Sequence, residues 1–240
     1  MSDTIHRVNH EIKQRKLNVL RVTELTPRMR RITLGGIELQ GFTSLGSDDH
    51  IKLLFAPTPG ADEAKPTLRE YTPRRIDLTA NELDIDFVLH GDGPASTWAA
   101  QAAPGHTLTI AGPRASMVVP DIFDSYLLIG DETAIPAIAR RLEELPAGRR
   151  VVAIIQIEDE HEKQPLPSKA EVDVRWLLRS ENLLDHVQEQ PLPQGRLYSW
   201  VALEKSLTRA VKGLLIDKGV NEDALKAAAY WRAVDSEDDA

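Results

Sequence analysis

The hydrophobic pattern of this chain of 240 residues changes halfway along, and this change most limits the folds it can adopt. The first half holds short segments in which apolar and polar residues alternate, separated by Gly and Pro: 17–22, 30–34, 51–55, 83–89 and 108–111. Alternation of this kind is typical of half-buried antiparallel strands. We therefore expect a small antiparallel barrel or sandwich, interrupted by one alanine-rich helix over 96–103.

In the second half, apolar segments alternate with segments of helical spacing. The segment 151–157 is an almost continuous apolar run, as expected of a strand buried on both faces. Segment 126–129 is an apolar strand, and 172–178 and 197–202 look like further strands. Segments 133–145 and 204–218 have helical spacing. This alternation indicates a parallel sheet with helices on its faces, beginning after a boundary near 120–125. Residues 221–229 fit an alanine-rich helix, although Tyr230-Trp231 would suit a strand, so both alternatives stay open.

Composition excludes several classes of protein. The chain has no cysteine, which excludes disulfides, thiolate metal sites and a cysteine nucleophile and fits a reducing compartment. Its net charge of −8 argues against general binding to nucleic acid. Its first residues are polar, so we do not expect them to be a signal peptide, and the sequence has no apolar run of about 18 residues. We therefore expect a cytoplasmic protein without membrane insertion. His6 and His10 have i, i+4 spacing but lack a third ligand, and we predict no metal site.

The run at 69–75, Arg-Glu-Tyr-Thr-Pro-Arg-Arg, concentrates cations, a ring and a hydroxyl. On an extended strand Arg69 and Tyr71 share one face. A ring that stacks on a heterocycle beside a guanidinium that binds phosphate would suit a nucleotide cofactor. The alternative is an ordinary barrel strand with a surface Arg and a core Tyr.

Two further motifs lie where a strand turns into a helix. Residues 90–97 (His-Gly-Asp-Gly-Pro-Ala-Ser-Thr) suit a phosphate at a helix N-terminus, or an ordinary turn capped by Ser96 or Thr97. Residues 130–136 (Gly-Asp-Glu-Thr-Ala-Ile-Pro) follow a predicted parallel strand, where a dinucleotide binds in a doubly wound fold. The acids Asp131 and Glu132 could instead complement the helix dipole. Hydrolase, zinc-protease and P-loop motifs do not occur in the sequence.

Taken together, these motifs resemble the siderophore-interacting protein family, flavin-dependent ferric-siderophore reductases related to ferredoxin–NADP reductases. The matching stretches, in the same order and spacing, are 69–74 (Arg-Glu-Tyr-Thr-Pro-Arg), 90–99 (His-Gly-Asp-Gly-Pro-Ala-Ser-Thr-Trp-Ala), 112–114 (Gly-Pro-Arg), 130–137 (Gly-Asp-Glu-Thr-Ala-Ile-Pro-Ala) and 230–232 (Tyr-Trp-Arg). The resemblance covers residues 15–233. It implies a six-stranded antiparallel FAD-binding barrel over 15–122 and a parallel-sheet NAD(P)H-binding α/β domain over 123–240.

The resemblance also implies a set of site residues. The FAD-binding residues are Arg69, Tyr71, Thr72, His90, Gly93, Pro94, Ala95, Ser96 and Thr97. The NAD(P)H-binding residues are Gly130, Asp131, Glu132 and Thr133, and the basic residues for the substrate are Lys52, Arg114 and Arg232. The sequence departs from the family pattern where Leu203 and Ala229 replace glycines and where Ala233-Val234 replaces Arg-Gly. In the family pattern, 225–231 is a strand.

The expected activity is FAD-dependent reduction of chelated Fe(III) by NADPH or NADH, which releases iron from an anionic ferric siderophore. The flavin supplies the redox chemistry, so a catalytic side chain is not required. The departures keep open a non-catalytic siderophore carrier, and a flavin reductase with another acceptor is a third alternative. Acids at 158–160 after the second α/β strand favour NADH, the family habit favours NADPH, and Arg149 and Arg150 lie at the wrong end of that strand. We expect a monomer.

Overall fold

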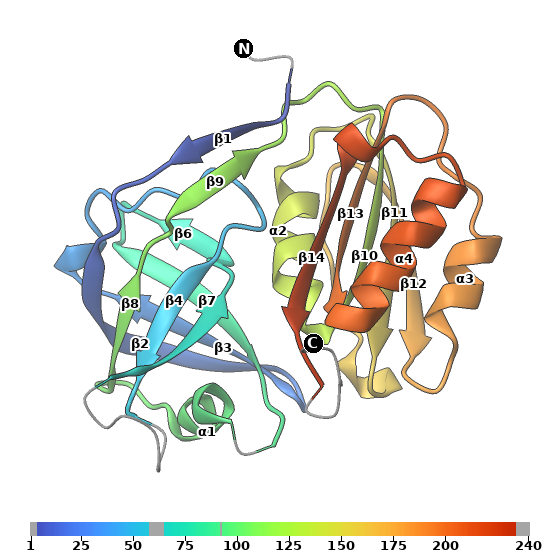
Figure 1. Cartoon of the computed structure of the whole chain (residues 1–240). Helices are drawn as coiled ribbons and strands as arrows, with labels where there is room; N and C mark the ends of the chain where they lie inside the picture. Colours follow the sequence, from blue (N-terminus) through green and yellow to red (C-terminus); the bar gives the residue numbers. More distant parts are fainter. Residues whose placement is uncertain (1–3, 58–64, 92, 234–240) are drawn as a thin grey trace. The chain divides into compact units, whose positions relative to one another are not determined.

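The computed structural model describes residues 4–57, 65–91 and 93–233, which form two compact units (Figure 1). The first unit ends at Val119 and the second begins at Pro120. The functional domains predicted to meet at 122/123 stay a prediction. No helix in the described part of the chain is long and apolar enough to cross a membrane.

The first unit is built on an antiparallel sheet. Within the described residues it has seven strands in the order β5-β4-β8-β2-β3-β7-β6. Their bounds are β2 (Gln14–Thr26), β3 (Met29–Gly35), β4 (Ile51–Phe55), β5 (Thr67–Tyr71), β6 (Arg75–Asp77), β7 (Glu82–Val88) and β8 (Thr107–Ala111). A separate ribbon pairs β1 (His6–Asn9) with β9 (Ala115–Val118), η1 spans Ile37–Leu39, and helix α1 spans Pro94–Gln101. The predicted antiparallel architecture is confirmed, with a seventh strand because the three residues of β6 form an additional edge.

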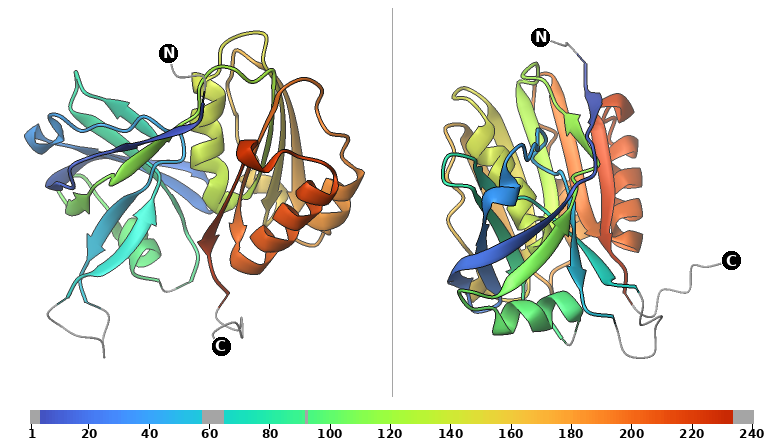
Figure 2. Two further views of the ribbon diagram at one scale, coloured as in Figure 1. Left: turned by 45° about the horizontal axis from the view of Figure 1, so that its top comes forward. Right: turned by 90° about the vertical axis from the view of Figure 1, so that its left-hand side faces the viewer.

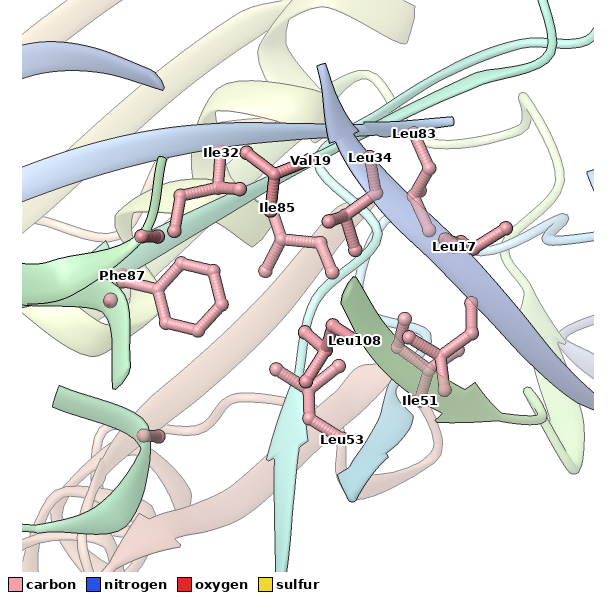
Figure 3. Close-up of a cluster of buried hydrophobic side chains, with 14 of the residues drawn as sticks. Leu17, Val19, Ile32, Leu34, Ile51, Leu53, Leu83, Ile85, Phe87 and Leu108 are labelled. Carbon is pink, nitrogen blue, oxygen red and sulfur yellow. The ribbon is translucent and has the colours of Figure 1, made fainter. Parts of the chain in front are cut away.

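The core of this unit follows from the alternation seen in the sequence. Every second side chain of the central strands points inward and is almost completely buried (Figure 3). The residues that do so are Leu17, Val19, Ile32, Leu34, Ile51, Leu53, Leu83, Ile85, Phe87, Leu108 and Ile110. Burial of each such side chain stabilises the fold by about 1.5–3 kcal/mol, so a one-residue shift in register would cost the whole core.

The second unit is a parallel sheet, as predicted, and its described strands have the order β12-β11-β10-β13-β14. The strands are β10 (Ser125–Asp131), β11 (Arg150–Ile157), β12 (Glu171–Leu178), β13 (Leu197–Glu204) and β14 (Leu225–Trp231). The helices are α2 (Ile135–Glu144), α3 (Leu183–Glu189) and α4 (Lys205–Asp217), with 3-10 turns η2 (Glu132–Ala134), η3 (Glu160–Glu162) and η4 (Glu222–Ala224). Helix α2 covers one face of the sheet, and α3 and α4 cover the other (Figure 2).

The segment 221–229 is not the helix that its alanines suggested. Residues Leu225–Trp231 form β14, which pairs in parallel with β13 from Ser199↔Leu225 onward, as in the family pattern. Alanine has the highest intrinsic helix propensity, but the difference is only a few tenths of a kcal/mol per residue. The backbone hydrogen bonds that complete the sheet outweigh it.

Candidate cofactor and dinucleotide sites

The predicted FAD motif of the first unit lies on edge strand β5. Arg69 is exposed, and Tyr71 is half-buried, with its ring centroid 4.5 Å from that of Phe87. Burial raises the pKa of Tyr71 to about 12, although nearby Arg69 lowers it. The phenol therefore keeps its proton at physiological pH and can donate a hydrogen bond. Thr72, the next residue, is buried.

The second FAD motif forms the turn into helix α1. Gly93 is the N-cap residue, and a side-chain cap is not among the hydrogen bonds of this helix. The alternative of a turn capped by Ser96 or Thr97 is therefore not what forms. The Ser96 hydroxyl accepts from the His90 N–H at 2.9 Å, and the Thr97 N–H donates to the Gly93 carbonyl. Serine in the first turn here ties the end of the strand to the helix. Asp92 lies outside the described residues.

Two interactions hold helix α1 on the barrel. Trp98 packs against Phe55 and Phe87, with ring centroids 6.0 and 5.6 Å apart. At the other end, Arg30 Nη1 of β3 donates to the carbonyls of Ala99 and Ala100 at 2.8 and 2.7 Å. A cation on the last carbonyls satisfies acceptors that a helix cannot satisfy itself. The N-terminus of α1 is thereby held in a fixed direction.

This arrangement fits a dinucleotide cofactor such as FAD. The first N–H groups of a helix have no intrahelical acceptor, and among the described residues a side-chain cap hydrogen bond is not found here. A Cβ added at Gly93 would meet nothing within 4 Å, so the described residues leave space beside this glycine. Backbone donors and the helix dipole together favour a phosphate at that position.

In the second unit, Gly130 lies one residue before the end of the fully buried strand β10, where the turn η2 and helix α2 pack closely. A Cβ at Gly130 would lie 2.4 Å from Ala134 Cβ, 3.2 Å from the Ala202 carbonyl oxygen and 3.3 Å from Ile138 Cδ1. Carbon atoms in contact are normally about 3.5–4.0 Å apart. Packing of the helix turn on the strands therefore requires this glycine whether or not a dinucleotide is bound.

The acids that follow Gly130 are bonded to the protein itself. Asp131 Oδ1 accepts from the N–H and the hydroxyl of Thr133 at 2.9 and 2.6 Å. Its Oδ2 accepts from Trp231 Nε1 at 2.7 Å, which joins the carboxyl ends of β10 and β14. Asp131 thus caps η2 and anchors the indole of Trp231. The role of 130–133 as dinucleotide ligands stays a prediction.

Glu132 is buried and forms an ion pair with Arg179 Nη2. Desolvation raises the pKa of Glu132, whereas the charge of Arg179 lowers it. Arg179 Nε is also 3.3 Å from Glu158 Oε2, and the Arg179 Cζ lies 6.0 Å from the ring centroid of Trp231. No motif in the sequence marks Arg179; the only signal is its place directly after the third strand of the α/β unit.

The other charged residues discussed for this unit have local partners. Asp159 accepts from the His161 N–H at 2.8 Å, and Glu160 pairs with Lys163. Arg149 pairs with Asp121 at the amino end of β11, far from the carboxyl end where dinucleotides bind. Of the acids at 158–160, Glu158 is thus the one that faces a cation across the sheet edge.

The predicted substrate cations are exposed in both units. Lys52 on β4 pairs in register with Ala111 of β8, three residues before Arg114, so both cations lie at one end of the barrel sheet. Glu70 is opposite Lys52 on β5 and lies 4.0 Å from His50. Arg232 follows Trp231 at the end of β14. That the three cations form one pocket stays a prediction.

The two departures from the glycine pattern are sterically harmless. Leu203 is completely buried in the core under α4, in the same cluster as Val211 and Leu215. Ala229 is exposed on the edge strand β14 and does not have a positive φ.

The neighbouring Glu204 caps helix α4. Burial favours its neutral acid, but hydrogen bonds from Ser206, Leu207 and Ala233 outweigh that and lower the pKa of Glu204. The Glu204 carboxylate therefore connects the first turn of α4 to Ala233, which follows the last strand β14.

The histidine pair of the N-terminus has other partners. His6 Nδ1 is 3.0 Å from the Thr4 carbonyl oxygen, and His10 Nε2 is 2.8 Å from Ser116 Oγ. Because β1 is a strand, i, i+4 spacing separates their positions by about 13 Å instead of one helical turn. In residues 4–57, 65–91 and 93–233, three or more potential metal ligands do not gather at any point.

Comparison with known proteins agrees with the motifs. Residues 123–234 match the family model described as siderophore-interacting protein, and residues 18–63 and 58–117 match the siderophore-interacting FAD-binding domain. The NADPH-dependent ferric-chelate reductase of Escherichia coli (strain K12) is 35% identical, over 95% of this chain and 96% of the relative. Ferric vibriobactin reductase ViuB of Vibrio cholerae is 30% identical, over 97% of this chain and 93% of the relative. A crystal structure of a siderophore utilization protein from T. fusca matches with a TM-score of 0.88 at 35% identity, over 98% of this chain and 99% of that one. The chain therefore belongs to the siderophore-interacting protein family, as the motifs predicted.

Proposed function

We propose that this chain is an FAD-dependent ferric-siderophore reductase that takes electrons from NADPH and releases iron by reducing chelated Fe(III). The observation that carries the proposal is the similarity to the Escherichia coli NADPH-dependent ferric-chelate reductase, which extends over nearly the whole of both chains. The open N-terminus of α1 beside Tyr71 supports it, because both features suit FAD.

The residues proposed to hold FAD are Arg69, Tyr71, Thr72, His90, Gly93, Pro94, Ala95, Ser96 and Thr97. The N–H groups at the start of α1 are proposed to bind the pyrophosphate. The Ser96 hydroxyl accepts from the His90 N–H and so holds the loop between β7 and α1 against the helix. Tyr71 donates from a phenol that stays neutral because its pKa is about 12. Arg69 is exposed and supplies a guanidinium for a phosphate oxygen.

When bound, FAD supplies acceptance of a hydride and delivery of single electrons. The protein then needs no acid, base or iron ligand of its own; it has to position the cofactor and attract the chelate. Lys52, Arg114 and Arg232 are proposed to attract anionic ferric chelates, against the overall charge of −8. Ferrous iron binds hard oxygen ligands more weakly, so reduction releases it.

The test is spectroscopic. FAD-loaded protein is yellow, and NADPH is expected to bleach it without oxygen; addition of a ferric siderophore is expected to restore the colour while a ferrous chelator records Fe(II). Two Fe(III) are expected per NADPH, because a hydride carries two electrons. Protein that cannot be loaded with FAD would refute the proposal and favour a carrier. Bleaching without accelerated iron reduction would point to another acceptor. A monomeric state and a cytoplasmic location are part of the same proposal.

A further inference from the structure

We propose that Arg179 recognises the 2′-phosphate of NADPH and that Glu158 competes with that phosphate for the same guanidinium. This inference rests on the proposed function, because it takes a nicotinamide dinucleotide as the electron donor. It assigns the choice between NADPH and NADH, which the sequence leaves open, to one ion pair.

Three adjacent strands bring the residues of this ion pair together. Glu132 follows β10, Glu158 follows β11 and Arg179 follows β12, and these strands are neighbours in the sheet. Dinucleotides bind outside the carboxyl ends of parallel strands in doubly wound folds. In such folds an acidic residue binds the ribose 2′-hydroxyl of NADH, and a nearby Arg accommodates the 2′-phosphate of NADPH. This chain presents both kinds of residue at one place.

The two carboxylates hold Arg179 unequally. The Glu132 side chain is only 7% exposed and pairs with Nη2, so it is a fixed anchor. The Glu158 side chain is 42% exposed and lies 3.3 Å from Nε, so its contact with Arg179 is longer and more exposed to solvent. A guanidinium has five N–H donors, and within residues 93–233 its ion pairs go through Nε and Nη2. Nη1 and, once Glu158 turns away, Nε can therefore bind two phosphate oxygens.

The charges decide which ligand displaces Glu158. A phosphomonoester carries about −1.5 to −2 charges at pH 7, and Arg binds it through two parallel hydrogen bonds. Such a group outcompetes one exposed carboxylate, whose pairing contributes little. A 2′-hydroxyl cannot displace Glu158 and donates to it instead. Glu158 thus weakens NADPH binding and supports NADH, while Arg179 does the reverse.

The experiment uses FAD-loaded full-length protein and isothermal titration with adenosine 2′,5′-bisphosphate and 5′-AMP, which differ in the 2′-phosphate. The unaltered protein is expected to prefer the bisphosphate. Arg179→Gln is expected to weaken the bisphosphate about tenfold or more, equivalent to about 1.4 kcal/mol, and to leave 5′-AMP within about twofold. Glu158→Gln is expected to tighten the bisphosphate about threefold, because the competitor is gone.

Arg175→Gln is the matched control. Arg175 lies on β12, the strand that Arg179 follows, is also exposed and pairs with Asp173. This change therefore removes one positive charge near β12 without altering the ion pair of Arg179. Arg175→Gln is expected to leave the affinities for both the bisphosphate and 5′-AMP unchanged. Arg179→Gln could fail to fold because Glu132 is left without its cation. In that case the double variant Glu132→Gln/Arg179→Gln removes both charges, and its affinities for the two probes provide the same comparison.

The outcomes separate the two ideas. Equal effects of Arg179→Gln on both probes, no effect on either, or no preference in the unaltered protein would overturn the role of Arg179. Absence of bleaching by both NADPH and NADH would instead refute the proposed function. Bleaching of the unaltered protein with unchanged probe selectivity in Arg179→Gln leaves the function standing and removes only this inference.

Discussion

Gly130→Ala is expected to destabilise the α/β unit through a clash inside the protein. The added methyl would meet Ala134 Cβ at 2.4 Å, more than about 1 Å inside normal carbon contact, with the Ala202 carbonyl and Ile138 close behind. The neighbouring atom is a short side chain on a buried turn, so backbone has to move. We expect a loss of about 2–3 kcal/mol, in the upper range for overpacking. In a unit of this size that lowers the Tm by about 10 °C, measured by calorimetry.

A double-variant cycle tests this reasoning. Ala134→Gly removes the methyl that is too close, and it alone costs about 1 kcal/mol through lost burial and backbone entropy. The combination Gly130→Ala/Ala134→Gly is then expected to be at least about 1 kcal/mol more stable than the sum of the single changes predicts. Additivity within about 0.5 kcal/mol would contradict the steric argument. So would a Gly130→Ala protein of normal stability that binds dinucleotide poorly, because the glycine would then serve ligand approach.

Three other changes test the barrel unit. Arg30→Gln removes the cation from the last carbonyls of α1, and we expect it to weaken FAD retention by about 1.5–3 kcal/mol, measured by the flavin absorbance remaining after dialysis; full occupancy would contradict this. The raised pKa of Tyr71, about 12 against an ordinary 10, means that the unfolded state loses its proton first, so stability is complete below pH 10 and falls as the pH rises toward 12. Tyr71→Phe is expected to reduce this fall, and identical Tm profiles above pH 9 would contradict the burial argument. Lys52→Gln is expected to raise KM for an anionic ferric chelate at low salt, and this increase is expected to shrink as added salt screens the charge. The rate of flavin bleaching by NADPH is expected to stay unchanged. Equal effects on anionic and uncharged chelates would show that Lys52 does not steer the substrate.

The elements that could be predicted from the sequence are those in which the spacing of apolar residues reflects which side chains are buried. Alternation in 83–89 and the apolar run at 151–157 correspond to β7 and β11. The buried apolar side chains of β7 occupy one face, with Asp84 and Asp86 buried on the other, whereas β11 is apolar on both faces. Strand β6 has three residues and helix α3 seven, too few for a period to appear. Strand β14 has the composition of a helix, and only its pairing with β13 makes it a strand.

The site divides in the same way, because local motifs are visible in sequence and charge compensation across strands is not. The helix after the Gly-Pro turn was predicted over 96–103, and the structure has it at Pro94–Gln101, because Pro94 forms its first turn after the Gly93 N-cap. Glu158, in contrast, favours NADH when considered alone, since its partner lies 21 residues later on another strand. In the fold Arg179 Nε lies 3.3 Å from this carboxylate, and we propose that the two groups together decide between a 2′-hydroxyl and a 2′-phosphate. The family's NADPH-dependent relative and the acid at 158 are therefore compatible, because the cation that reconciles them reaches the acid only in the folded sheet.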